Sequence, residues 1–465
     1  MKLLRFQISL LSIFTLIISS CGTISPESPN IQITDLINHS QPRSHISIPI
    51  KINLRPYFEE TDSSIPTSFT GKKQQCEGTS YSYQFNRGPI HFDGMGSRLL
   101  FDVDGKYSLK INYCPQCTGI FNYKGNCVVP RIYSSCGVDE PKRDIEVGYA
   151  TKIRVTDNYM LSSETKLRKV KPLTPCEITV FNYDATATLT EEITSALKEL
   201  EKDIDSEISS IDLRPDLQDL WSLLEQSMEI EDYGFLYLNP KEVSMSPITF
   251  KGDTAYFNAI LEAQPTIITE QIESDNTKIP SLKQYDKRNG FDISMDVYAT
   301  YDSLSSVLNK NIQGTEVPIK NKKIRLDNAE IYGAKNSEVH LKVSFSGDKK
   351  GTFFFTGTPI FDSTLQKLTF PDIEFDVKTK SALLKSAKWL FNKKITTAVR
   401  NASEIDLKPY LDTMKAELNQ SINVELTKGT YMSGEIEDVK MNFIHPMEAV
   451  LHLRFRGLGK LEIQL

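Results

Sequence analysis

Polar and apolar residues alternate along much of this chain, and a period of two is typical of half-buried β-strands. The first such stretch is "SHISIPIKINL", residues 44–54, and the last is "AVLHLRFRGLGKLEI", residues 449–463. In the last stretch one face is apolar and is expected to meet a core. The opposite face is expected to meet solvent, and it carries His452, Arg454 and Arg456.

A turn is predicted within "SRLLFDVDGKYSLKINY", residues 97–113, because Asp104-Gly105 separates two alternating apolar runs. An Asp-Gly pair in such a setting favours a two-residue β-hairpin. The apolar residues expected to face one another across the turn are Leu99, Phe101 and Val103 before it, and Tyr107, Leu109 and Ile111 after it.

Two stretches change to helical spacing. In residues 188–209 apolar residues recur every three or four positions, and Thr188 and Glu191 are spaced for a capping box. Pro215 then opens a second predicted helix, since proline suits the first helical turn. Each of these helices has one apolar stripe, so each is expected to lie against a sheet.

The second helix occurs twice. "IDLRPDLQDL" at residues 211–220 is echoed by "IDLKPYLDTM" at residues 405–414, and similar residues continue to match without a gap. This repeat is much longer than a solenoid unit, so each copy must be domain-sized. The sequence predicts an α+β fold of two related tandem modules, each a long curved antiparallel sheet packed on amphipathic helices.

The predicted boundaries follow from composition. Residues 45–270 form the N-terminal module with a Cys-rich insert, a polar linker covers 271–290, and 291–465 form the C-terminal module. A Ser- and Pro-rich tether is expected at residues 21–44. Residues 1–20 have the charged start and apolar centre of a secretory signal.

The signal ends in "IISSC", an arrangement that resembles a bacterial lipobox. Cys21 is therefore the predicted lipidation site, through which the mature chain would be anchored in a membrane. Gly22 rather than aspartate follows, which is typical of an outer-membrane address facing the periplasm. The expected location is the bacterial cell envelope.

Six further cysteines fall within about one hundred residues, and an oxidising compartment favours disulfides among them. The sequence does not determine their pairing, and "CPQC" followed by Cys127 and Cys136 also has the spacing of a four-thiolate zinc site. Disulfides are the favoured interpretation, with no metal. The six candidates are Cys76, Cys114, Cys117, Cys127, Cys136 and Cys176.

Charge and motifs argue against several functional classes. The net charge of -6, with both signs interspersed, argues against a nucleic-acid partner. The chain contains none of the nucleophile-elbow, P-loop, zinc-protease or dinucleotide-binding motifs, and its histidines are scattered. We therefore expect no enzyme activity and no cofactor.

Three further stretches are "YQFNRGPIHFDGMGSRLLFDVDGKYSL" near the start and "FDVKTKSALLKSAKWLFNKKI" with "IDLKPYL" near the end. They resemble DUF4403, a bacterial family of unknown function. This resemblance implies an exported, often lipid-anchored protein and supplies no catalytic residues. More distantly, the order of elements is similar to that of tubular lipid-binding proteins of the bactericidal/permeability-increasing type, which implies a curved sheet around a helix with lipid in the seam.

The leading functional hypothesis is a lipid- or amphiphile-binding lipoprotein that serves lipid transport or envelope maintenance. Burial of an acyl chain supplies its affinity without charged groups. The alternatives are a scaffolding lipoprotein that binds an envelope protein and, third, a periplasmic hydrolase. The predicted groove residues are Leu220, Trp221, Leu224, Phe257, Ala259, Leu261, Leu418, Leu451, Leu453 and Phe455.

Overall fold

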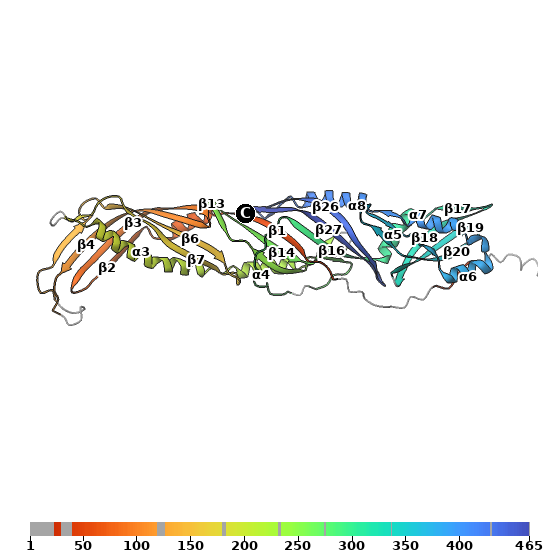
Figure 1. Ribbon diagram of the computed structural model, residues 1–465, viewed down its shortest axis with the longest axis horizontal. Helices are drawn as coiled ribbons and strands as arrows, with labels where there is room; N and C mark the ends of the chain where they lie inside the picture. Colours follow the sequence, from red (N-terminus) through yellow and green to blue (C-terminus); the bar gives the residue numbers. More distant parts are fainter. Residues whose placement is uncertain are drawn as a thin grey trace, which may run out of the picture.

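The protein is a long rod of antiparallel strands with helices along its sides (Figure 1). The structure is a computed structural model, and it describes residues 23–28, 40–118, 126–178, 183–230, 234–273, 276–335, 337–427 and 430–464. Cys21 and the predicted signal sequence lie outside these residues. The mixture of long strands and helices confirms the predicted α+β class.

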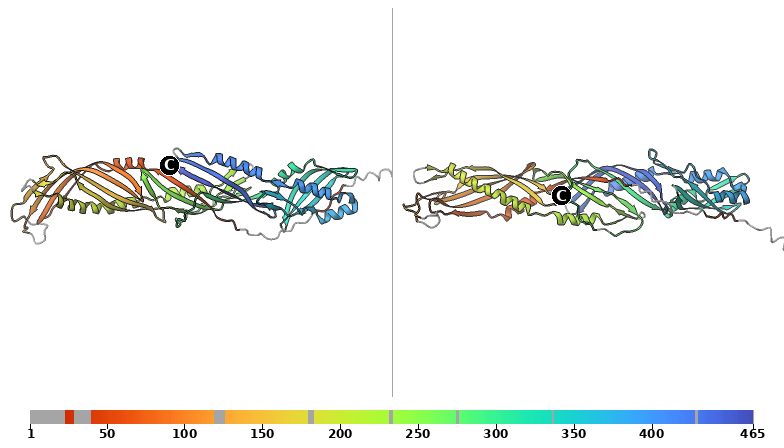
Figure 2. Two further views of the ribbon diagram at one scale, coloured as in Figure 1. Left: turned by 45° about the horizontal axis from the view of Figure 1, so that its top comes forward. Right: turned by 60° about the horizontal axis from the view of Figure 1, so that its bottom comes forward.

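The middle of the rod is a sheet in which strands from the two ends of the folded chain meet strands from its middle (Figures 1 and 2). β1 (Ser44–Asn53) pairs antiparallel with β14 (Thr254–Ala263) over ten residues. β16 (Phe291–Thr300) pairs antiparallel with β27 (Val450–Gln464), also over ten residues. β1 also meets β16 and β27, which joins the two halves through backbone hydrogen bonds.

The N-terminal half is a meander of long strands that curves around one side of a helix (Figure 2). Its helices are α2 (Arg55–Ser64), α3 (Thr186–Ser209) and α4 (Arg214–Leu224). Its remaining strands are β2 (Ser68–Lys73), β3 (Gly78–Gly96), β4 (Arg98–Cys114), β5 (Ile132–Cys136), β6 (Arg143–Val155), β7 (Leu161–Pro172), β8 (Glu177–Ile178), β9 (Tyr183–Asp184), β10 (Met228–Ile230), β11 (Gly234–Tyr237), β12 (Pro240–Met245), β13 (Thr249–Gly252) and β15 (Thr266–Ile268).

The hairpin predicted at Asp104-Gly105 is wrong, because β4 continues straight through these residues. The turn lies earlier, at Gly96-Ser97, where Gly96 has a φ of 60°. The alternation is unbroken across Gly105, since the apolar residues named on either side of the predicted turn lie on one face of β4. Gly105 is needed for packing: a Cβ there would lie 2.2 Å from Cε2 of Phe85 on β3.

α3 covers the edge of the N-terminal sheet. Carboxylates of α3 accept hydrogen bonds from backbone N–H groups of β7: Thr165 N donates to Asp205 Oδ1 at 3.0 Å, and Leu167 N donates to Glu201 Oε1 at 2.8 Å. These bonds satisfy donors that an exposed edge strand would leave unpaired. The helix begins at Thr186, two residues before the predicted cap.

The C-terminal half begins with the central strand β16 and closes with β27, and helices and further strands lie between them. Its helices are α5 (Tyr301–Ile312), α6 (Val377–Ser386), the 3₁₀ turn η1 (Lys388–Leu390), α7 (Lys393–Ala402) and α8 (Lys408–Ser421). Its remaining strands are β17 (Glu316–Ile319), β18 (Lys322–Lys335), β19 (Glu338–Gly347), β20 (Gly351–Gly357), β21 (Ile360–Asp362), β22 (Lys367–Thr369), β23 (Glu374–Phe375), β24 (Ile405–Asp406), β25 (Val424–Thr427) and β26 (Thr430–Pro446).

The two polar segments that were predicted to be a linker and a tether are both attached to the folded halves. Within the expected linker 271–290, Ile279 is buried beside Trp221, and Tyr159 Oη donates to Pro280 O at 2.6 Å. Within the expected tether, Ile24 is buried in the core of the C-terminal half. Single apolar residues in polar segments thus attach both stretches to the fold. Among the described helices, none has the length and apolar character needed to cross a membrane.

Candidate functional site

An apolar pocket lies in the C-terminal half, between α5 and the sheet formed by β18, β19 and β20. Its cavity volume is about 60 Å³, and the pocket is open to solvent on one side. Val307, at 37% exposure, connects the pocket to the surface. The lining residues are Tyr301, Leu304, Val307, Leu308, Ile331, Val339, Leu341, Gly357, Pro359, Leu368, Phe370, Ile373, Ser403, Ile405 and Leu451.

α5 forms one wall of this pocket, and its polar residues bind it to β18 beside the pocket. Asn309 Nδ2 donates to Ala329 O at 2.8 Å, and Ala329 N donates to Asn309 Oδ1 at 2.7 Å. Ser305 Oγ accepts from Ile331 N at 2.8 Å. The apolar residues of the helix are then left to line the pocket.

The polar groups at the pocket are already hydrogen-bonded within the protein. Tyr301 Oη donates to the carbonyl oxygen of Met447, and burial raises the pKa of this phenol well above its usual value. Ser403 Oγ donates to Val399 O at 2.8 Å. The pocket therefore presents a surface suited to hydrocarbon rather than to a charged group.

A row of aromatic rings crosses the inner face of the N-terminal sheet. Phe58 of α2 stacks on Phe92 of β3 at 4.4 Å, Phe92 contacts Phe101 of β4 at 6.2 Å, and Phe101 stacks on Tyr149 of β6 at 5.3 Å. Tyr149 Oη donates to Leu197 O of α3 at 3.0 Å, and burial raises the pKa of Tyr149 to about 12, with the carboxylate of Glu201 adding to the shift. The row joins α2 to α3.

The sheet face expected to be solvated is in fact buried at His452 and Arg454. These residues are 3% and 8% exposed, and both contact Asp296 of β16. Residues before β1 cover them, since Arg454 Nη1 donates to Ser40 O at 3.4 Å and Gln41 Nε2 donates to Pro265 O at 2.7 Å. The prediction of a solvated face was wrong because the segment that covers it, at Ser40, lies about four hundred residues away in sequence.

Within this buried cluster the negative charge of Asp296 is balanced by the positive charge of Arg454. Burial opposes ionisation of Asp296, but the close contact with His452 Nε2 and the hydrogen bonds from Arg454 outweigh it and hold the pKa of Asp296 below its usual value. Tyr298 stacks on His452 with ring centroids 4.6 Å apart. Arg456, by contrast, lies at the surface and pairs with Asp292. We interpret the cluster as structural.

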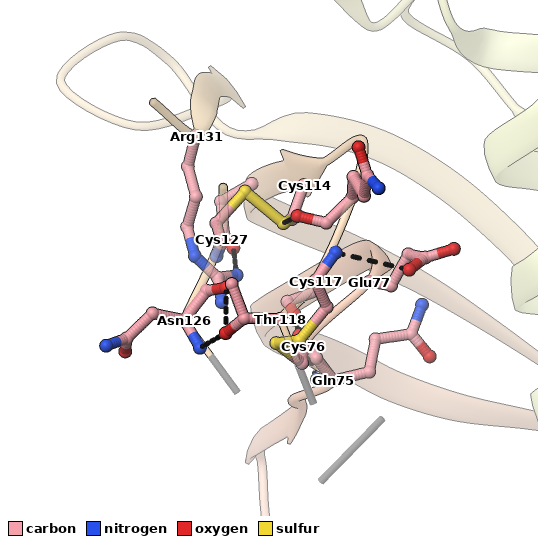
Figure 3. Close-up of a disulfide and its surroundings, with 12 residues drawn as sticks. Gln75, Cys76, Glu77, Cys114, Cys117, Thr118, Asn126, Cys127 and Arg131 are labelled. Atoms are coloured by element: carbon pink, nitrogen blue, oxygen red, sulfur yellow. Dashed lines mark hydrogen bonds between the residues drawn. A yellow bond between two sulfur atoms is a disulfide. The ribbon is translucent and has the colours of Figure 1, made fainter. Parts of the chain in front are cut away.

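The six cysteines form three disulfides, which confirms the predicted bonds. The pairs are Cys76–Cys117, Cys114–Cys127 and Cys136–Cys176. Figure 3 shows the first two side by side, with Cys117 N donating to Glu77 Oε2 at 3.2 Å. Both thiols of "CPQC" are thus engaged with different partners, and a four-thiolate zinc site does not form from them.

The predicted groove residues fall in separate places. Trp221, Leu224 and Leu261 pack together in the N-terminal half, where Trp221 Nε1 donates to Thr277 Oγ1 at 3.0 Å. Leu220 and Leu418 are exposed on α4 and α8, at 50% and 40%. Three more of the predicted groove residues are half-buried on the central strands: Phe257 and Ala259 on β14, and Phe455 on β27.

Of the predicted groove residues, only Leu451 lines the pocket; the other lining residues were not predicted. Leu451 lines the pocket, and Leu453 packs beside the buried cluster of Tyr301 and Leu451. Leu304 and Leu308 were missed, although their spacing of four is the signal of an amphipathic helix. Val339 and Leu341 were also missed, although they belong to the alternating apolar pattern of β19.

Residues 42–465 match the family model described as a domain of unknown function, DUF4403. The match covers most of the chain, so this protein belongs to that family. A search of curated proteins gives no match.

Proposed function

We propose that this protein is a lipoprotein of the bacterial outer membrane, anchored through Cys21, that holds the hydrocarbon part of a lipid or other amphiphile. The observation that carries the proposal is the apolar pocket beneath α5, whose polar groups are hydrogen-bonded internally. Each methylene that leaves water contributes about 0.8 kcal/mol, so a short length of acyl chain suffices for binding.

The arrangement of the two halves supports this proposal. Each half pairs its first strand with its last, β1 with β14 and β16 with β27. Each half also contains a helix opened by proline, α4 at Pro215 and α8 at Pro409. We infer that the halves are related modules produced by duplication. Tandem modules of this order are similar to the tubular lipid-binding proteins, in which a seam between helix and sheet holds lipid.

Blocking the pocket mouth tests the proposal. Val307→Trp places a large ring at the mouth, whereas Leu223→Trp makes the same kind of change on an exposed surface of α4. We expect lipid extracted from the purified wild-type protein to be detected by mass spectrometry. Val307→Trp should weaken binding of a fluorescent-acyl phosphatidylglycerol by at least about tenfold, which corresponds to about 1.4 kcal/mol.

The control should bind the fluorescent lipid as the wild type does. If the wild-type protein carries no lipid and binds no probe, the lipid proposal fails. Equal binding by both tryptophan variants would place the ligand elsewhere in the molecule.

A second candidate function, docking of an envelope protein, is favoured by the surface around the disulfides. Several apolar side chains on β4, β5 and the Cys127 loop are about half exposed, and such a patch is typical of an interaction site. They are Tyr113, Val128, Val129, Ile132 and Tyr133. Loss of a co-purifying envelope protein from an Ile132→Ser/Tyr133→Ser variant, with lipid content unchanged, would support this alternative.

A further inference from the structure

The first described residues of the chain are bound to the outer end of the C-terminal half. Ile24 N donates to Lys350 O at 3.1 Å, and Thr352 N donates to Ile24 O at 2.9 Å, which forms a parallel bridge beside β20. The Ile24 side chain is 5% exposed, in the core cluster. Three residues later, Glu27 pairs with Lys378 of α6 at 2.9 Å.

Gly351 permits this close approach. A Cβ at this position would lie 2.2 Å from the carbonyl oxygen of Ile24, so any larger residue would push the N-terminal segment away. In Figure 1, β17, β19, β20 and α6 lie together at one end of the rod, and β2 and β4 lie at the other. The N-terminal segment is therefore fixed at the end of the rod farthest from the disulfides.

This end carries a basic surface with exposed apolar side chains, formed by α6, η1 and the start of α7. Residues 377–395 contain six lysines and no aspartate or glutamate. Val377, Leu384 and Phe391 are 71%, 50% and 44% exposed. Lys322 Nζ lies 4.7 Å from the centre of the Trp389 ring, which places the tip of β18 beside η1. We call this surface the basic tip.

Two of the six lysines already have acidic partners: Lys378 pairs with Glu27, and Lys380 Nζ lies 3.0 Å from Glu374 Oε1. Nearby, Glu316 Oε1 is 3.2 Å from Lys323 Nζ. The exposed lysines Lys385, Lys388 and Lys393 lie further along the surface and supply the charge of the basic tip.

We propose that the basic tip binds the surface of a bilayer that contains anionic phospholipid, so that the rod stands on its C-terminal half with the disulfide end projecting away. The proposal rests on the proposed lipidation of Cys21. Three residues of extended chain span at most about 11 Å, so a lipid on Cys21 would enter the membrane close to Ile24. Lysines attract anionic headgroups, and Leu384 and Phe391 can enter the boundary between headgroups and acyl chains.

Vesicle binding by a Cys21→Ser protein without its signal sequence tests the surface independently of the anchor. We expect it to bind vesicles of phosphatidylglycerol and phosphatidylethanolamine at least about tenfold more strongly than phosphatidylcholine vesicles, with binding weakened by salt. Lys385→Glu/Lys388→Glu should abolish this preference. The matched control, Lys72→Glu/Lys73→Glu on β2, makes the same change in charge at the other end and should bind normally.

The two tryptophans report the orientation. In Trp221→Phe the remaining Trp389 lies at the basic tip, and brominated phospholipids should quench its fluorescence. In Trp389→Phe the remaining Trp221 is buried in the N-terminal half and should not be quenched. Equal quenching of both, or no preference for anionic vesicles, would overturn the proposal.

The test of the basic tip can fail or succeed independently of the test of the pocket. Val307→Trp should leave vesicle binding unchanged while it reduces binding of the fluorescent lipid. Loss of vesicle binding with an intact pocket would refute the basic tip alone, and failure of radioactive palmitate to label the full precursor would refute the lipid anchor alone.

Discussion

Arg454 of β27 and Asp296 of β16 form a buried bidentate ion pair, with Nε 2.6 Å from Oδ1 and Nη2 3.0 Å from Oδ2. Both residues are nearly inaccessible to solvent, and His452 Nε2 lies 3.0 Å from the same Oδ2. β16 opens the C-terminal half and β27 closes it. The pair therefore joins the two ends of this half at the central sheet.

Removal of one partner from this pair should strongly destabilise the protein. Arg454→Met leaves the Asp296 carboxylate without its guanidinium, and uncompensated buried charges cost about 3–5 kcal/mol. Arg456→Met is the matched control, because Arg456 pairs with Asp292 at the surface and is 51% exposed at its side chain. The control should lose at most about 1 kcal/mol. Guanidinium denaturation followed by circular dichroism measures both, and equal losses would contradict a buried, energetically coupled pair.

The same pair should make stability depend on acid pH. The pKa of Asp296 is lowered from its ordinary value of 3.8 in the folded protein, so ionised Asp296 favours the folded state. Its contribution is complete above that value and is lost as pH falls toward the folded pKa. Asp296→Asn should thus be less stable at neutral pH and show a smaller loss of melting temperature on acidification. Asp292→Asn, at the more exposed pair, should show a smaller effect of both kinds; an unchanged acid response in Asp296→Asn would refute the assignment.

The sequence predicts features that depend on neighbouring residues. The alternation in residues 44–54 gives β1, and Pro215 and Pro409 stand at the start of α4 and α8 because proline suits the first turn. The export signal and the cysteine count predict disulfides. Pairing was beyond the sequence, since it depends on which loops meet in space.

Features set by distant segments were not predictable. Whether a sheet face is buried depends on what covers it, and Ser40 covers Arg454 of β27. Gly105 has the sequence signal of a turn, yet it makes room for Phe85 on the neighbouring strand. The pocket combines α5 with strands from across the C-terminal half, so the alternation could mark Val339, Leu341 and Leu451 as apolar but could not show that they line one pocket.

The buried disulfide should stabilise the protein more than the peripheral one of matched loop length. Cys136–Cys176 and Cys76–Cys117 close loops with separations of 40 and 41 residues, so their effects on the entropy of the unfolded chain are nearly equal. Cys136 and Cys176 are fully buried in the core beneath α3, and Cys176 N donates to Thr186 Oγ1 at 2.8 Å. Cys136→Ala/Cys176→Ala should therefore lose about 1–3 kcal/mol more than Cys76→Ala/Cys117→Ala, through the lost core packing. Urea denaturation of the two variants provides the comparison, and equal losses would show that loop closure alone accounts for both bonds.

Gly105→Ala should destabilise the N-terminal half through contact with Phe85. The added Cβ would lie 2.2 Å from the Phe85 ring, and such overpacking costs about 1–3 kcal/mol. Gly457→Ala on β27 is the matched control, because a Cβ there meets no atom within 4 Å and the gain in strand propensity is similar. In a Phe85→Ala background the cost of Gly105→Ala should largely disappear, since the ring that it strikes is gone. A double-mutant cycle measured by denaturation tests this coupling. If the Gly105→Ala cost persisted unchanged without Phe85, the glycine would be required for its backbone conformation, and β4 would not pass straight through it.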